Sequence, residues 1–294
     1  MFVATLIAAG KLTDEVVREA IDRLDMTGHD VGAPHWLDEH DAADIYFQGS
    51  LVSARSELAK MDHGALDVVV QPMGDRTKKL IIADMDSTMI TVECIDELAD
   101  YAGLKDQVAA ITKRAMTGEL DFRAALEERV ALLGGMSEGV LAECRYERVK
   151  LTRGARTLVQ TMKAHGAHSV LVTGGFTAFA GPVGEAIGFD KVVANELVIK
   201  DGMLTGKVAE PIVDKDAKLA TLTAEAAKLG LPLAATLAVG DGANDIPMIT
   251  SAGLGIGYHP HPAAEEAADA AIRHHDLTAL LWAQGYPRRS WVLG

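Results

Sequence analysis

The chain has 294 residues, of which 49% are hydrophobic, and this length and composition suggest a main domain with a sizeable core plus a smaller domain. Its 42 acidic and 28 basic residues give a formal net charge of −14. This charge argues against a nucleic-acid-binding protein, because there is no basic surface to neutralise phosphates. It would also repel an anionic substrate, so an anion site would need a metal ion, basic side chains or backbone N–H groups.

The cysteines and the N-terminus bear on location. Cys94 and Cys144 have neither zinc-site spacing nor the pattern of a disulfide framework, which favours a reducing compartment. The apolar run at residues 2–9 has no basic residue before it and is too short to span a membrane. We therefore expect a cytoplasmic protein that acts on neither a membrane nor a nucleic acid.

Residues 1–74 are predicted to form a small α+β domain. Strand-like and helical patterns alternate in the order β-α-β-α-β, with strands at 2–7, 43–47 and 66–71 and helices at 13–24 and 53–61. This order suggests a regulatory or adaptor module with a ferredoxin-like fold. Trp36 and the acidic run at 38–41 fall between the first helix and the second strand, and we interpret that run as a solvated loop. The turn-rich segment 72–75 then forms a linker.

A buried strand predicted at residues 80–83 runs directly into Asp84 and Asp86. Desolvating two carboxylates is costly, so such a pair usually binds a cation or takes part in chemistry. Two residues apart at a strand end, they can point to the same side and share Mg²⁺, which prefers oxygen ligands. The alternative is a polar loop in which Asp86 or Ser87 caps the following helix.

Helical patterns fill residues 88–165, and no strand-like run interrupts them. Because this block lies between the first and second strands of a sheet, we expect an inserted helical cap at about residues 90–165. Within it, Phe122 begins a helix that also carries Arg129. Taken alone, these two residues would be interpreted as a buried aromatic and a surface arginine.

The next buried strand, predicted at 169–172, ends in the sequence TGGF at 173–176. A hydroxyl group followed by the free N–H groups of two glycines can cradle a phosphate, especially where a helix begins next. The alternative is an ordinary tight turn. Lys215 and Lys218 lie at the start of a later helix, where a cation is mildly unfavourable, so one of them could serve an anion.

A third buried strand, predicted at 236–239, is followed by the acidic loop GDGAND at 240–245. In a parallel sheet all three loops would meet at the carboxyl edge, where ligands bind. We therefore expect an α/β fold with a doubly wound, Rossmann-like parallel sheet, a Mg²⁺ site between the two acidic loops and a phosphate site beside them. Asp84 becomes a candidate nucleophile that forms an aspartyl phosphate, and Asp86 a candidate acid and base.

These motifs resemble the haloacid dehalogenase superfamily of phosphatases, and within it the phosphoserine phosphatase family. DMDST matches the superfamily pattern DxDxT, TGGF and GDGAND match its second and fourth motifs, and the Lys218 region matches its third. More specific to the family are ECIDELA at 93–99 and AMTGELDF at 115–122, with Arg129 seven residues later. The resemblance covers about residues 78–280.

The resemblance implies that residues 75–294 form a phosphatase domain that uses Mg²⁺ to hydrolyse L-phosphoserine, the last step of serine biosynthesis. The metal would be held by Asp84, by the backbone carbonyl of Asp86 and by Asp241, with Asp245 supporting the loop. The substrate-binding residues that it implies are Glu93, Phe122, Arg129, Thr173, Gly174, Lys218 and Asn244. Among these, Glu93 and Arg129 would bind the amino and carboxylate groups, and Phe122 would shield the site from water.

Two features depart from the family pattern or extend it. Thr173 stands where the family usually carries serine, so the hydroxyl is kept and the extra methyl group bears on rate or substrate fit. Residues 1–74 more loosely resemble the ACT-like domains fused to some bacterial members, and such a module is compatible with a homodimer. One alternative is a related phosphatase or phosphotransferase for another small phosphomonoester, such as phosphohomoserine. Another is a non-catalytic amino-acid sensor, against which the intact DxDxT and GDGAND loops argue.

Overall fold

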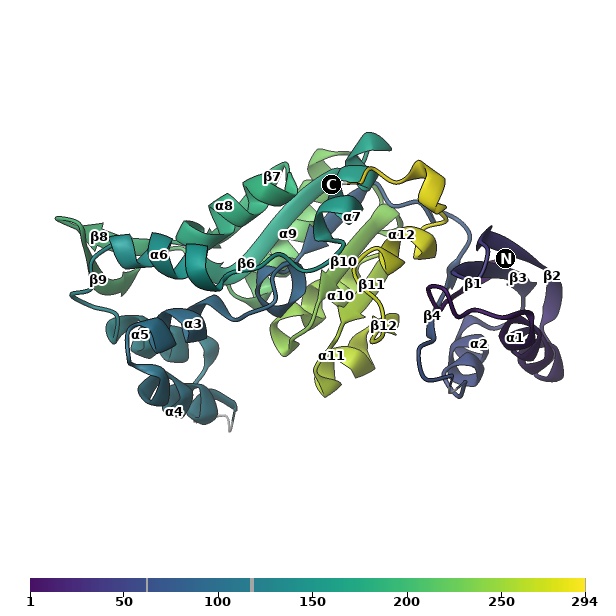
Figure 1. Cartoon of the computed structure of the whole chain (residues 1–294), viewed down its shortest axis with the longest axis horizontal. Coiled ribbons are helices and arrows are strands. Elements are labelled where there is room, and N and C mark those ends of the chain that lie inside the picture. Colours follow the sequence, from purple (N-terminus) through teal and green to yellow (C-terminus); the bar gives the residue numbers. More distant parts are fainter. Residues whose placement is uncertain (62, 117–118, 294) are drawn as a thin grey trace.

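The computed structural model describes residues 1–61, 63–116 and 119–293. Three parts lie in a row along its long axis: an N-terminal sheet with two helices, a central parallel sheet covered by helices, and a group of helices at the far end (Figure 1). Two positions of the predicted cap motif, residues 117–118, lie outside the described residues. In the described part of the chain, no helix has both the length and the apolar character needed to cross a membrane.

The N-terminal part has a four-stranded antiparallel sheet in the order β2-β3-β1-β4. Its elements are β1 (Phe2–Ile7), α1 (Asp14–Met26), β2 (Asp30–Asp38), β3 (Ala42–Gln48), α2 (Leu51–Leu58) and β4 (Asp67–Pro72). The side chains of Thr13 and Ser50 accept backbone N–H bonds and so cap the two helices. This order and connectivity are those of a βαββαβ unit. The boundary predicted at residue 74 falls between β4 and the central sheet.

Strand β2 was not predicted, and of the residues 38–41 that were interpreted as a solvated loop, Asp38 ends β2 while 39–41 form a turn in which Glu39 and His40 are exposed. β2 is an edge strand with mostly exposed residues, and it includes a glycine and Pro34, so it lacks the alternation that reveals a strand. Asp38, at its end, accepts hydrogen bonds from Trp282 Nε1 at 2.7 Å and from the backbone N–H of Arg288 at 2.8 Å. The acidic run therefore helps to join the N-terminal sheet to the rest of the chain.

The central sheet has six parallel strands in the order β12-β11-β10-β5-β6-β7. The strands are β5 (Leu80–Ala83), β6 (His168–Phe176), β7 (Lys191–Asn195), β10 (Thr236–Gly240), β11 (Leu254–Tyr258) and β12 (Ala270–Ile272). β5 lies in the interior, and the chain places β6 on one side of it and β10 on the other. This reversal of strand order puts the expected ligand-binding crevice at the carboxyl end of β5.

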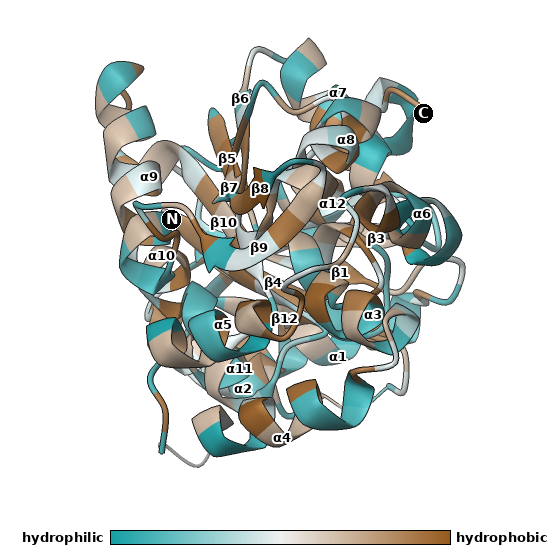
Figure 2. Ribbon diagram, turned by 90° about the vertical axis from the view of Figure 1, so that its left-hand side faces the viewer, coloured by the Kyte–Doolittle hydropathy of each residue, from teal (hydrophilic) through white to brown (hydrophobic). Residues whose placement is uncertain are grey.

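Helices cover both faces of the central sheet, as the predicted doubly wound fold requires. They are α7 (Ala155–Ala164), α8 (Thr177–Ile187), α9 (Lys215–Lys228), α10 (Ile246–Ser251), α11 (Pro262–Ala267) and α12 (Ala279–Ala283). Side chains of α7, α8 and α12 belong to one buried apolar cluster, and side chains of α9 and α10 to another on the opposite face. The apolar strands lie inside these layers (Figure 2), which explains why they read as continuous hydrophobic runs.

The cap consists of α3 (Cys94–Tyr101), α4 (Lys105–Met116), α5 (Phe122–Ala131) and α6 (Gly139–Arg148), placed at one end of the sheet (Figure 1). An antiparallel β-bridge between Ile90 and Leu151 joins the chain segments that enter and leave the cap. The cap is therefore shorter than the predicted 90–165, because α7 packs against β6 and α8 in the body. An amphipathic helix has the same sequence pattern in either place, so periodicity could not separate α7 from the cap.

A hairpin from the body also reaches the cap. It is formed by β8 (Leu197–Lys200) and β9 (Met203–Val208), which follow β7. β9 packs against α5, and the backbone of Leu204 exchanges hydrogen bonds with Gly135 and Met136 at 2.8 Å each. Arg123 on α5 forms an ion pair with Glu210 just beyond the hairpin. The cap is thus joined to the body by contacts other than its two chain connections.

Candidate active site

The first acidic motif follows β5 in a tight turn, Met85–Met89, and its side chains are fixed by local hydrogen bonds. Asp86 Oδ1 accepts the backbone N–H of Cys94 at 3.1 Å. Ser87 has a left-handed backbone with φ of 53°, and its hydroxyl donates to Glu93 Oε1 at 2.7 Å. Asp84 and Asp86 therefore lie at the carboxyl edge of the sheet, as predicted, and the turn ties them to the start of α3.

Lys218 is held between two carboxylates in the interior. Its Nζ lies 2.7 Å from Asp84 Oδ1 and 2.6 Å from Asp245 Oδ1, and its exposure is 1%. Asp214 caps α9 by accepting two backbone N–H bonds, which fixes the first turn that carries Lys218. Burial opposes the charged form of Lys218, but the adjacent carboxylates of Asp84 and Asp245 outweigh it and raise the pKa of the amine. Of the two predicted lysines, Lys218 is the one at the site.

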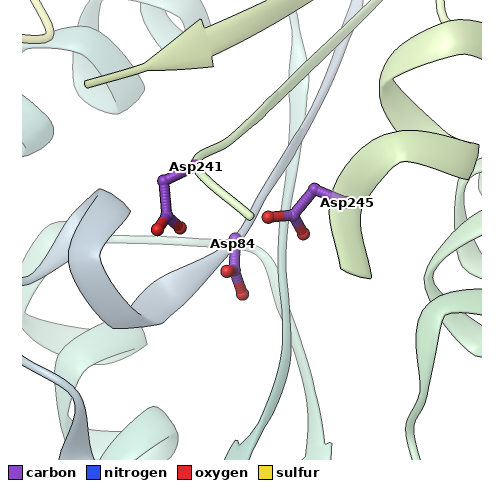
Figure 3. Close-up of side chains that lie close together, drawn as sticks. All are labelled: Asp84, Asp241 and Asp245. Carbon is purple, nitrogen blue, oxygen red and sulfur yellow. The ribbon is translucent and has the colours of Figure 1, made fainter. Parts of the chain in front are cut away.

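Three carboxylates meet between β5 and the GDGAND loop (Figure 3). One oxygen each of Asp84, Asp241 and Asp245 lies within 4.8 Å of the others, and all three residues are buried. The hydroxyl of Thr88 donates to Asp241 Oδ1 at 3.2 Å, and the backbone N–H of Gly242 donates to Asp245 Oδ2 at 3.1 Å. This cluster contains the side chain of Asp245, which was predicted as a support, and lacks the side chain of Asp86.

Two of these carboxylates, Asp84 and Asp241, have raised pKa values. Burial and the charge of Asp245 raise the pKa of Asp84 well above its usual range, against the opposing effect of Lys218. Burial, then Asp245 and Glu93, raise the pKa of Asp241 to about 6. A divalent cation among these hard oxygen donors would offset the repulsion, so the residues fit Mg²⁺.

The TGGF loop ends β6 on the other side of β5. The backbone N–H of Gly175 donates to Thr173 Oγ1 at 2.9 Å. A Cβ atom at Gly175 would lie 2.8 Å from Asp86 Oδ2, so a larger residue here would displace the Asp86 side chain. The amide of Asn195 donates to Gly174 O at 2.8 Å and accepts the backbone N–H of Val213 at 2.7 Å. Asn195, which the sequence did not single out, therefore holds the loop in place.

One cavity of about 420 Å³ brings most of the predicted residues together. The predicted residues that line it are Asp84, Asp86, Glu93, Phe122, Arg129, Thr173, Gly174, Asp241 and Asn244. Two predicted residues, Lys218 and Asp245, are absent from the lining because they are buried behind Asp84. The three loops that were expected to converge do form one site.

The cap supplies the other wall of this cavity. Phe122 stands over the TGGF loop, since a Cβ atom at Gly174 would lie 3.1 Å from its ring. Arg129 donates from Nε to the carbonyl of Ala125 at 3.1 Å. Burial lowers the pKa of Arg129, with Asp96 and then Glu93 opposing the shift. A half-buried guanidinium that lines a cavity is suited to binding a carboxylate.

Several residues that line the cavity were not predicted from the sequence. Asp96 follows Glu93 by about one helical turn, so the ECIDELA motif contained the signal that both face the same side. Ser87 also lines the cavity, although within the DMDST motif it was considered only as a helix cap, and Thr112 and His261 line it without a distinctive sequence context. The side chain of His261 is well exposed, and its Nε2 lies 3.9 Å from Asp241 Oδ2.

Comparison with known proteins gives close relatives. The phosphoserine phosphatase SerB2 of Mycobacterium tuberculosis is 43% identical over 242 residues, which are 82% of this chain and 58% of that protein. The phosphoserine phosphatase of Streptococcus thermophilus is 45% identical over 200 residues, which are 68% of this chain and 93% of that protein. The chain thus spans little more than half of the first relative and nearly all of the second.

The fold has relatives among solved structures as well. The crystal structure of a probable phosphoserine phosphatase from Vibrio cholerae matches with a TM-score of 0.77 and 32% identity, covering 98% of this chain and 87% of that one. A family model described as haloacid dehalogenase-like hydrolase matches residues 81–250, which include the strand before Asp84 and the GDGAND loop. On these matches and the site described above, the chain belongs to the haloacid dehalogenase-like hydrolase family.

Proposed function

We propose that this chain is a Mg²⁺-dependent phosphatase that hydrolyses L-phosphoserine to L-serine and phosphate. The observation that carries the proposal is one cavity lined by Asp84, which is paired with Lys218, and by Glu93 and Arg129. Phosphoserine carries a phosphate, an ammonium and a carboxylate, and these residues offer the complementary charges. The names of relatives at 43% and 45% identity support the same substrate.

The residues that would hold Mg²⁺ are Asp84, Asp241 and the backbone carbonyl of Asp86, with Asp245 fixing the loop. When bound, the ion would neutralise part of the carboxylate charge and polarise a phosphoryl group. Together with Lys218, that positive charge favours the ionised form of Asp84 that a nucleophile requires. This local positive charge also compensates for the net charge of −14, which would otherwise repel a phosphorylated substrate.

In the first step, a carboxylate oxygen of Asp84 attacks phosphorus and the bond from phosphorus to the serine oxygen breaks. Asp86 gives its proton to the leaving alkoxide, so that serine departs as a neutral alcohol. Burial and the charge of Glu93 raise the pKa of Asp86 to about 7, which is suited to a proton donor near neutral pH. The product of this step is an aspartyl phosphate on Asp84.

In the second step, Asp86 is a carboxylate and takes a proton from water. The water oxygen attacks phosphorus, the bond to Asp84 breaks, and phosphate leaves. We assign the phosphoryl oxygens to Thr173, the backbone N–H groups of its loop and Asn244, and we assign Lys218 to this phosphate site as the buried positive charge behind Asp84. These groups keep their places throughout because the loops are fixed by hydrogen bonds such as that from Asn195 to Gly174.

We assign the choice of substrate to the cap wall of the cavity. Glu93 would bind the ammonium group and Arg129 the carboxylate, while Phe122 excludes water from the reacting atoms. The ring of Phe122 already stands over Gly174, so the closed arrangement that this role requires is compatible with the fold. A phosphomonoester without an amino-acid end would use the phosphate site but not these contacts.

The test is phosphate release from L-phosphoserine, phosphohomoserine, phosphothreonine and p-nitrophenyl phosphate with Mg²⁺, for the wild type and Asp84→Asn. Selective turnover of phosphoserine that is lost in Asp84→Asn is the expected result. Comparable turnover of all four substrates would keep the phosphatase chemistry and overturn the assignment of Glu93 and Arg129. Selective turnover of phosphohomoserine would identify a different substrate, and no turnover at all would favour an amino-acid sensor.

A further inference from the structure

Thr112 on α4 lies between two cavities and has a hydroxyl group that nothing described in the structure satisfies. It lines the main cavity of about 420 Å³ and also a second cavity of about 240 Å³ between α3 and α4. Its Oγ1 atom is buried and has no hydrogen-bond partner among the described residues. Buried polar atoms are usually paired, so an unpaired hydroxyl in the wall of an active site calls for an explanation.

Other threonines within helices of the same chain show the ordinary solution. The hydroxyls of Thr221, Thr223 and Thr250 each donate to the carbonyl oxygen four residues earlier, at 2.8 to 3.1 Å. Thr112 has the same option with Val108, yet that bond is not made in the described structure. Threonine in a helix readily uses two χ1 rotamers, and turning from one to another moves the hydroxyl to a different side of the helix.

The neighbours of Thr112 indicate which ligand group its hydroxyl would meet. α4 packs against both α3 and α5, and these helices place Asp96 and Arg129 in the same cavity wall. The ammonium of a substrate already has two carboxylates available, Glu93 and Asp96. A substrate carboxylate can accept about four hydrogen bonds. Arg129 can donate about two of them, because its Nε already donates to the carbonyl oxygen of Ala125.

We propose, building on the proposed function, that Thr112 is a further specificity-determining residue. Its hydroxyl donates a hydrogen bond to the α-carboxylate that Arg129 binds. The unpaired hydroxyl is then satisfied when an amino-acid phosphoester enters and stays unsatisfied when the ligand lacks a carboxylate. Thr112 thus adds to the preference for phosphoserine over phosphomonoesters that bind through the phosphate alone.

The experiment compares Thr112→Val, which has the same shape but no hydroxyl, with Thr112→Ser, which keeps the hydroxyl. Each is assayed with phosphoserine and with phosphoethanolamine, which lacks only the carboxylate. We expect Thr112→Val to raise KM for phosphoserine about tenfold with little change in kcat, and to leave kcat/KM for phosphoethanolamine nearly unchanged. Thr112→Ser should behave like the wild type with both substrates.

An equal loss of kcat/KM on both substrates, or no loss on either, would overturn the proposal. Thermal unfolding without ligand gives a readout independent of turnover: Thr112→Val should unfold at the same or a higher temperature, because it removes an unpaired buried hydroxyl. A lower temperature would mean that the hydroxyl is bonded within the protein, which would also overturn it. If the wild type hydrolyses p-nitrophenyl phosphate but not phosphoserine, the proposed function fails and this inference fails with it.

Discussion

Replacement of Arg129 by methionine tests how the cap recognises its substrate. The Nε of Arg129 donates a hydrogen bond to the carbonyl oxygen of Ala125, which leaves the two terminal nitrogens for a ligand carboxylate. Each hydrogen bond to a charged group is worth about 1.5–3 kcal/mol, so losing both should cost about 3–6 kcal/mol. This corresponds to a fall in kcat/KM for phosphoserine of about 100- to 10,000-fold. Methionine keeps most of the apolar packing of the side chain, so stability should change little.

The matched substrate is phosphoethanolamine, which has the phosphate and the amine but no carboxylate. For Arg129→Met we expect kcat/KM for phosphoethanolamine to stay within about threefold of the wild-type value, because this substrate has no carboxylate for Arg129 to bind. Arg129→Lys keeps the charge without the planar fork and should fall between the wild type and Arg129→Met. Steady-state kinetics with both substrates decides the matter. An equal loss with both would refute the assignment of Arg129 to the carboxylate.

Three further predictions concern the metal and phosphate end of the site. Lys218→Met leaves Asp84 and Asp245 without their buried cation and should destabilise the Mg²⁺-free protein by about 3–5 kcal/mol in urea unfolding; unchanged stability would contradict the ion pairs. Gly175→Ala places a methyl group 2.8 Å from Asp86 Oδ2, so kcat should fall at least about tenfold without global unfolding, as circular dichroism would confirm. Chelation should abolish phosphate release and added Mg²⁺ should restore it, whereas full activity in excess chelator would refute metal dependence.

The central fold was predictable because its strands are buried on both faces and each ends in a polar loop. The run at 80–83 and the acidic residues after it could be placed at one sheet edge without any coordinates, and that placement is confirmed. β2 could not be found, because an exposed edge strand containing Pro34 carries no hydrophobic alternation. The position of α7 was equally inaccessible, because a helix packed on the sheet and a helix packed in a cap need the same apolar stripe.

The candidate site, like the fold, was predictable from the sequence only in part. Asp84, Asp241 and the TGGF loop were expected to converge, since parallel strands end at the same edge, and they line one cavity. The ion pairs of Lys218 with both Asp84 and Asp245 could not be foreseen, because sequence spacing does not give the direction of a side chain across two loops. Thr112 was missed for a different reason: that its hydroxyl has no partner among the described residues is visible only in the structure.

The most direct test of the central claim is to trap the covalent intermediate. The protein would be mixed with ³²P-labelled L-phosphoserine and Mg²⁺, quenched in acid within milliseconds, digested and examined for labelled peptides. We expect label on the peptide that contains Asp84, removed by hydroxylamine as is usual for an acyl phosphate, and no label in Asp84→Asn. Phosphate release by Asp84→Asn at the wild-type rate, or label on a different residue, would contradict Asp84 as the nucleophile.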